Sequence, residues 1–292
     1  MYQGVYTAII TPFKKDGSVD EECLKKLIDF NIKNGVSGIV PCGTTGESPT
    51  LSHEEHDRVI ELAVEHVDGR AKVIAGTGSN ATSEAIRLTK HAEEAGADAC
   101  LLVSPYYNKP TQEGLYRHFK AIADSVDFDC IIYNIKGRTA VNVETSTLMR
   151  IANDCKNIVG VKEASGDLNQ MKDVIAQRLE GFSILSGDDN MTLDLIKSGG
   201  NGVISVASNL VPDRMVAMVN AALDEDFEKA AQLDKALAPL FKVEFIETNP
   251  IPIKAALALK GMCEEVYRLP MCEMSKEHKE ELKRVLKGMG II

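Results

Sequence analysis

Short apolar segments rich in β-branched residues recur along the chain, and each is followed by a stretch with helical periodicity. None of them alternates with polar residues, so they are predicted to be parallel strands covered on both faces. Eight such β-then-α units predict an α/β fold, a (β/α)8 TIM barrel rather than an open sheet. The segments span residues 5–10, 38–40, 73–75, 99–103, 130–133, 158–161, 183–185 and 203–206.

The strand signals stop near residue 212, and three helical stretches are predicted after it, at 214–240, around 253–259 and at 276–286. The run 224–226 is predicted to be a solvated turn. No Gly/Ser-rich linker separates the two parts, so we expect them to pack together. We therefore predict a barrel domain at residues 1–225 and a C-terminal helical domain at 226–292.

Charge and cysteine content limit the partners and the compartment. The chain of 292 residues carries a formal charge of −10 and no basic run, which argues against nucleic acid as a partner. Its seven cysteines form no C-x-x-C pair, as expected of reduced thiols in a cytoplasmic protein. We find no signal peptide and no apolar run of about 18 residues, so no membrane association is predicted.

Polar side chains follow the predicted strands at their carboxyl ends, which in a parallel barrel meet on one rim. Lys162 ends an apolar run and is expected to point into the barrel mouth. Desolvation there lowers a lysine's pKa and yields the neutral amine that attacks a ketone to form a Schiff base. An ion pair of Lys162 with Glu163 or Asp188 is the structural alternative, and spacing alone leaves it open.

Further groups on this rim suit proton relay or the binding of carboxylates. Tyr133 and Thr45 have hydroxyls suited to relaying protons during carbinolamine dehydration, although tyrosines at such positions also serve as packing residues. The turn 43–46 offers backbone N–H groups to a carboxylate. Arg138 offers a bidentate fork to a second carboxylate, and a surface ion pair is its alternative.

Two other patterns are weak. Residues 76–81 fit the dinucleotide pattern G-x-G-x-x-A, but Asp98 precedes the next strand instead of ending it, so it is not placed to reach a ribose. His53 and His56 lie one helical turn apart without H-E-x-x-H spacing or an obvious third ligand. We therefore predict neither a nicotinamide cofactor nor a metal site.

Eight motifs, in order, resemble those of the 4-hydroxy-tetrahydrodipicolinate synthase (dihydrodipicolinate synthase) family of pyruvate-dependent class I aldolases. The resemblance runs from Gly4 to Pro270. The motifs are Thr11-Pro12-Phe13, Gly43-Thr44-Thr45-Gly46-Glu47-Ser48, Pro105-Tyr106-Tyr107-Asn108, Tyr133-Asn134 with Arg138-Thr139, Gly160-Val161-Lys162-Glu163-Ala164, Ser186-Gly187-Asp188-Asp189, Gly202-Val203-Ile204-Ser205 and Asn249-Pro250-Ile251-Pro252.

The resemblance implies a reaction and its residues. Lys162 would form the imine with pyruvate, and the enamine would attack L-aspartate 4-semialdehyde, in lysine and diaminopimelate biosynthesis without a cofactor. Proton relay would fall to Tyr133, Thr45 and Tyr107, the last reaching into a neighbouring subunit of a homotetramer built as a dimer of dimers. Substrate contacts would come from Thr44, Thr45, Arg138 and the backbones of Gly187 and Ile204.

Two features bear on specificity and regulation. The rival activities are those of N-acetylneuraminate lyase and the 2-keto-3-deoxy sugar-acid aldolases. Lys136 stands where the family usually has proline, next to Arg138. The resemblance also implies an allosteric pocket for lysine. Its residues would be Ser48, Pro49, His53, His56, Asn80, Glu84 and Tyr106, with Pro49 replacing the commoner alanine.

Overall fold

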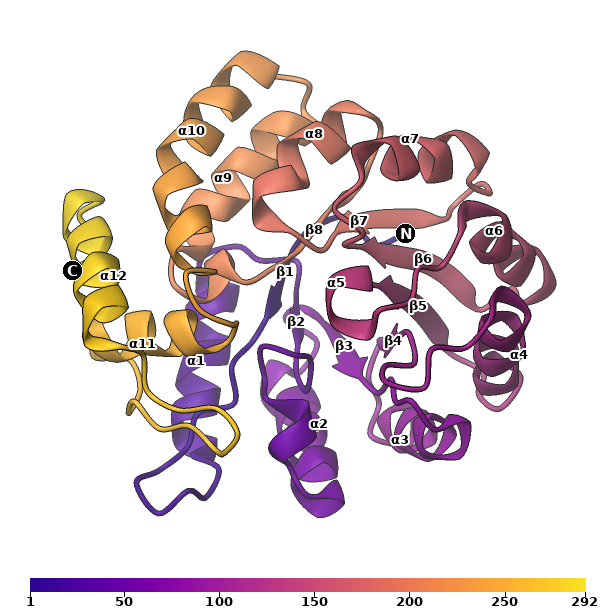
Figure 1. The fold of residues 1–292 in the computed structure, drawn as a ribbon, viewed down its shortest axis with the longest axis horizontal. Coiled ribbons are helices and arrows are strands. Elements are labelled where there is room, and N and C mark those ends of the chain that lie inside the picture. Colours follow the sequence, from indigo (N-terminus) through magenta and orange to yellow (C-terminus); the bar gives the residue numbers. More distant parts are fainter.

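Eight parallel strands close into a barrel in sequential order in the computed structural model, which describes residues 1–292 (Figure 1). The last strand pairs with the first, so the sheet has no free edge. The predicted (β/α)8 barrel is thereby confirmed, with strand ends shifted by one or two residues. The strands are β1 (Gly4–Ala8), β2 (Gly38–Val40), β3 (Lys72–Gly76), β4 (Ala99–Val103), β5 (Asp129–Asn134), β6 (Ile158–Glu163), β7 (Ser183–Ser186) and β8 (Gly202–Ser205).

Helices cover the outside of the barrel, and several of them begin at a residue whose side chain caps the helix. Ser52 and Glu55 form the capping box that their spacing implies, and the Asp20 side chain accepts from the Cys23 N–H. The helices are α1 (Glu21–Lys33), α2 (His53–Val67), α3 (Thr82–Glu94), α4 (Gln112–Ala123), α5 (Lys136–Thr139), α6 (Thr145–Asp154), α7 (Leu168–Gln177), α8 (Thr192–Lys197), α9 (Pro212–Leu223), α10 (Phe227–Val243), α11 (Ile251–Leu259) and α12 (Lys276–Gly288), with 3₁₀ turns η1 (Ser48–Thr50), η2 (Asp189–Met191) and η3 (Ala207–Asn209).

The predicted helical stretch 214–240 is two helices in the structure. α9 packs on β1 and β8, as the last helix of a barrel does, and α10 turns back along it (Figure 1). The reversal occurs at 224–226, where Glu225 has a left-handed φ of 62° and Asp226 caps α10. We propose the boundary between barrel and helical extension at this turn, between residues 225 and 226.

A buried ion pair ties the helical extension to the barrel. Lys254 of α11 is 0% exposed, and its Nζ lies 2.5 Å from Glu47 Oε1 in the turn after β2. The Phe13 ring centroid lies 4.2 Å from the same Nζ, and Glu47 Oε2 accepts from the backbone N–H of Arg268. The turn that carries Thr44 and Thr45 is thus held by a contact 207 residues away in sequence.

All seven cysteines are free thiols; four are buried, two are half-buried and Cys272 is exposed. No helix combines the length and the apolar character needed to cross a bilayer.

Replacing Lys254 by Met should lower the free energy of unfolding by about 3–5 kcal/mol, because it leaves the Glu47 carboxylate buried without its cation. Chemical denaturation measures the loss. The double variant with Glu47→Gln removes both charges and should regain most of the lost free energy of unfolding. Lys120→Met, which breaks the exposed pair with Asp124, is the control. A loss below about 1 kcal/mol for Lys254→Met would show that the buried pair behaves like a surface pair.

Candidate active site

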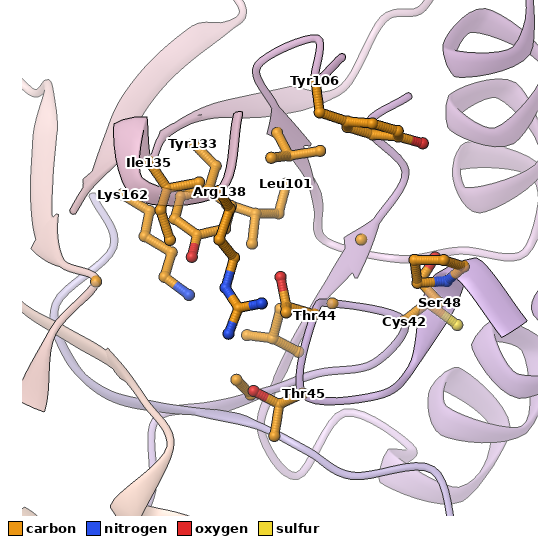
Figure 2. Close-up of a pocket in the computed structure, with 18 of the residues that line it drawn as sticks. Cys42, Thr44, Thr45, Ser48, Leu101, Tyr106, Tyr133, Ile135, Arg138 and Lys162 are labelled. Carbon is orange, nitrogen blue, oxygen red and sulfur yellow. The ribbon is translucent and has the colours of Figure 1, made fainter. Parts of the chain in front are cut away.

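Lys162 lies near the end of β6 and points into the mouth of the barrel (Figure 2). It is 5% exposed and flanked in register by Tyr133 of β5 and Leu185 of β7. Its Nζ is 4.2 Å from the centre of the Tyr133 ring. A Cβ on Gly187 would lie 3.1 Å from Lys162 Cε, so glycine there leaves room for the lysine side chain.

Burial lowers the pKa of Lys162 to about 8; the Arg138 charge acts in the same direction, and Asp188 and Asp189 oppose it. The alternative of an ion pair with Glu163 is wrong. That carboxylate accepts instead from the Ser165 N–H and from the Asn134 amide. Asp188 acts on Lys162 through its charge, without an ion-pair contact, so the amine remains free to react.

One continuous cavity of about 420 Å³ contains most of the predicted site residues. In Figure 2 the Lys162 amine, the Arg138 guanidinium and the Thr44 side chain face the same open space, and Tyr106 and Ser48 lie farther out. The predicted residues that line the cavity are Thr44, Thr45, Tyr133, Arg138, Lys162 and Gly187, and also Ser48, Pro49, His53, His56, Glu84 and Tyr106.

Three predicted site residues lie outside this cavity. Ile204 is fully buried in the apolar cluster of the barrel interior that also contains Tyr133. Tyr107 is 90% exposed, has a left-handed φ of 73° and does not line the chain's own cavity. Asn80 is half-buried, and its backbone carbonyl accepts from the side chain of Asn108.

Asn249 was not predicted as a site residue, although it begins one of the eight motifs. The Asn249 amide donates to Thr45 Oγ1 at 3.0 Å, and its backbone carbonyl accepts from Arg138 at 3.1 Å. Asn249 thus connects Thr45 to Arg138 from the segment just before α11. Because Thr45 Oγ1 accepts this hydrogen bond, its own proton is free for another acceptor.

The outer end of the cavity is built around Glu84. His53 Nε2 lies 2.9 Å from Glu84 Oε1, and Ser79 donates to the other carboxylate oxygen. The Ser79 hydrogen bond, together with His53, lowers the pKa of Glu84, which keeps it anionic. His56 Nε2 donates to the Gly76 carbonyl at 2.9 Å, and burial lowers the pKa of His56 to about 4.

The two weak sequence patterns have structural explanations. A Cβ on Gly76 would meet the Cys42 carbonyl oxygen at 2.3 Å, and one on Gly78 would meet the Val103 nitrogen at 2.2 Å. Close packing of backbones therefore accounts for both glycines. No group of three or more His, Cys, Asp or Glu side chains gathers as a metal site.

Lys136, the departure from the family pattern, lies at the first position of α5 and is exposed. Proline is favoured at this position because the helix does not use its N–H, so lysine and proline both fit the same backbone. The side chain does not line the cavity, whereas Ile135, Arg138 and Thr139 do.

A buried lysine with a lowered pKa, beside a tyrosine at the mouth of a (β/α)8 barrel, defines the class of barrel enzymes that act through a lysine imine. Within that class the chain belongs to the dihydrodipicolinate synthetase family, whose profile matches residues 1–289. It is 56% identical over the full length of both chains to 4-hydroxy-tetrahydrodipicolinate synthase of Syntrophus aciditrophicus.

The solved structures to which this chain is similar belong to the same family. Dihydrodipicolinate synthase of Aquifex aeolicus superposes with a TM-score of 0.98 at 51% identity, covering 99% of each chain. The enzyme of Cyanidioschyzon merolae, solved with lysine bound, has a TM-score of 0.96 at 39% identity, covering 100% of this chain and 99% of the other.

His56 should make the fold sensitive to mild acid. Its pKa is about 4 in the folded protein and ordinarily 6.5. Its contribution to the free energy of unfolding is therefore complete above pH 6.5 and is lost as pH falls toward 4. The total loss is about 3 kcal/mol. Chemical denaturation from pH 7 to 4.5 should show a shallower decline for His56→Gln than for the wild type. The exposed His53→Gln is the control, and an unchanged slope in His56→Gln would contradict neutral burial.

Proposed function

We propose that this chain condenses pyruvate with L-aspartate 4-semialdehyde to form 4-hydroxy-tetrahydrodipicolinate and water. The observation that carries the proposal is the Lys162 amine, desolvated and unpaired in a cavity shared with Tyr133, Thr45 and Arg138. The names of the relatives support this choice of aldehyde over a sugar aldehyde.

The reaction begins at Lys162. The neutral amine attacks C2 of pyruvate to form a carbinolamine, and loss of water gives the imine. Loss of a proton from C3 gives the enamine, whose C3 attacks the aldehyde carbon of the second substrate. The amino group of that substrate then adds to the former C2 carbon, closes the ring and expels the Lys162 amine.

Tyr133 and Thr45 are proposed to move the protons. Burial raises the pKa of Tyr133 far above neutrality, so its hydroxyl carries a proton to donate. Thr45 has its proton free because Asn249 donates to its oxygen. Thr44 and Thr45 would also hold the pyruvate carboxylate, with the Gly187 and Ile204 backbones proposed to line the pyruvate pocket.

Arg138 is proposed to bind the carboxylate of the semialdehyde. Its guanidinium lines the cavity opposite Thr44 and is held by the Asn249 carbonyl, which leaves N–H groups for a bidentate contact (Figure 2).

Tyr107 is proposed to complete the relay in a neighbouring subunit of a homotetramer. Its 90% exposure and strained backbone suit a residue that extends out of its own chain. A cytoplasmic location stays a prediction.

A coupled assay tests the substrate pair: a downstream NADPH-dependent reductase consumes the cyclic product. We expect turnover with pyruvate and the semialdehyde, and a loss of about a thousandfold or more for Lys162→Ala, because the nucleophile is gone. Lys172→Ala, on the exposed face of α7, is the control. Turnover only with N-acetylmannosamine or glyceraldehyde would contradict the choice of second substrate but retain Lys162 as the nucleophile.

The outer end of the cavity is proposed to bind lysine as a feedback inhibitor. The Glu84 carboxylate offers a counter-charge to an ammonium group, and Ser48, Pro49, His53, His56 and Tyr106 line the same space. Asn80 is the remaining residue proposed for the pocket. The lysine-bound relative supports this assignment.

Millimolar lysine should slow turnover and raise the melting temperature, because a ligand that binds only the folded state stabilises it. Glu84→Gln should raise the lysine concentration needed for both effects about tenfold, because losing this charge partner should cost about 1.4 kcal/mol of binding free energy. Glu113→Gln, on exposed α4, is the control. If lysine changes neither quantity in the wild type, the proposal is wrong.

A further inference from the structure

Two carboxyl groups are buried together behind the active site. Glu244, the residue that ends α10, is 1% exposed, and Asp189, the first residue of η2 after β7, is 2% exposed. α10 packs against η2, and Asp189 acts on Glu244 through its charge. Both Glu244 oxygens and Asp189 Oδ1 have no hydrogen-bond partner, whereas Asp189 Oδ2 accepts from the N–H groups of Val206 and Ala207, each at 2.9 Å.

Two adjacent buried carboxylates without a cation repel each other, and three unpartnered buried oxygens are costly. A single proton between one Glu244 oxygen and Asp189 Oδ1 removes the repulsion and gives a partner to two of the three oxygens. Asp189 Oδ2 already accepts from two backbone N–H groups, whereas Glu244 has no donor, so we place the shared proton on Glu244. Burial and the Asp189 charge both raise the pKa of Glu244 well above its ordinary value, which agrees with the proton residing on Glu244.

We propose that Glu244 is a positioning residue: as a neutral acid it donates to Asp189, and this one proton fixes the end of α10 to the active-site loops after β7 and β8. Those loops carry Gly187, Asp188 and Val206, which line the cavity. The role in catalysis rests on the proposed function, whereas the shared proton does not.

Ionisation of Glu244 would break this contact. η2, α8, α9 and α12 pack against α10, and the titratable group that acts on Glu244 is Asp189 of η2. Neither carboxyl is in an ion pair with a lysine, arginine or histidine, and the cation that acts on Asp189 through its charge is Lys162. An acid whose pKa is raised by folding makes its full contribution to the free energy of unfolding below about pH 4.5. That contribution is lost as pH rises through the pKa of the group in the folded protein.

The test compares Glu244→Gln, which keeps a donor for Asp189 but cannot ionise, with Glu244→Met, which keeps the length and removes the donor. Glu244→Gln should bind about one proton fewer in the folded state at neutral pH and show less loss of stability above pH 5. Its infrared spectrum should lack the band of a protonated carboxyl that the wild type shows. Glu247→Gln, which removes a carboxylate paired with His278, is the control and should retain that band.

Activity supplies a second, separate readout. Glu244→Met should lower kcat about tenfold, the effect of roughly 1.4 kcal/mol, and Glu244→Gln should restore it to within about twofold. If Glu244→Gln retains the protonated-carboxyl band, or is as impaired as Glu244→Met, the proposal is overturned. If the wild type lacks the proposed condensation activity, the proposed function fails, and the infrared and proton-uptake results still decide the shared proton.

Discussion

Closure of the eight-stranded barrel is the constraint on which the site depends, because it removes Lys162 from water. In an open sheet the ammonium would be hydrated and protonated at neutral pH. At the barrel mouth it is flanked by Tyr133 and Gly187, and its pKa falls to about 8. The same closure brings residues from several strands to one rim, so that hydroxyls and a guanidinium surround the amine.

The helical extension is part of the active site as well as of the fold. Lys254 fixes the turn that carries Thr44 and Thr45, and Asn249 connects Thr45 to Arg138. Glu244 is proposed to reach the loops after β7 and β8 through Asp189. Through Lys254 and Asn249 the extension thus holds residues that line the cavity.

Local patterns in the sequence predicted the parts of the structure that local physics determines. Continuous apolar runs identified all eight strands, and the position of Lys162 at the end of one of them placed it in the barrel mouth. The stretch 214–240 was predicted to be helical with a solvated turn at 224–226, and the structure divides it into two helices at that turn. The partners of Glu47 and Glu244 could not be predicted, since each contact joins residues far apart along the chain. The resemblance implied that Ile204 contributes its backbone to the pocket, and that role stays a prediction; its side chain packs in the barrel interior.

The most direct test of the account is to trap the imine: the protein is incubated with pyruvate and borohydride over a range of pH, and the modified lysine is identified by mass spectrometry. The account predicts one reduced pyruvate adduct, on Lys162, with an initial trapping rate that rises through about pH 8 as the amine loses its proton. An adduct on a different lysine, or a trapping rate on Lys162 that rises only near the pKa of an exposed lysine, would contradict it.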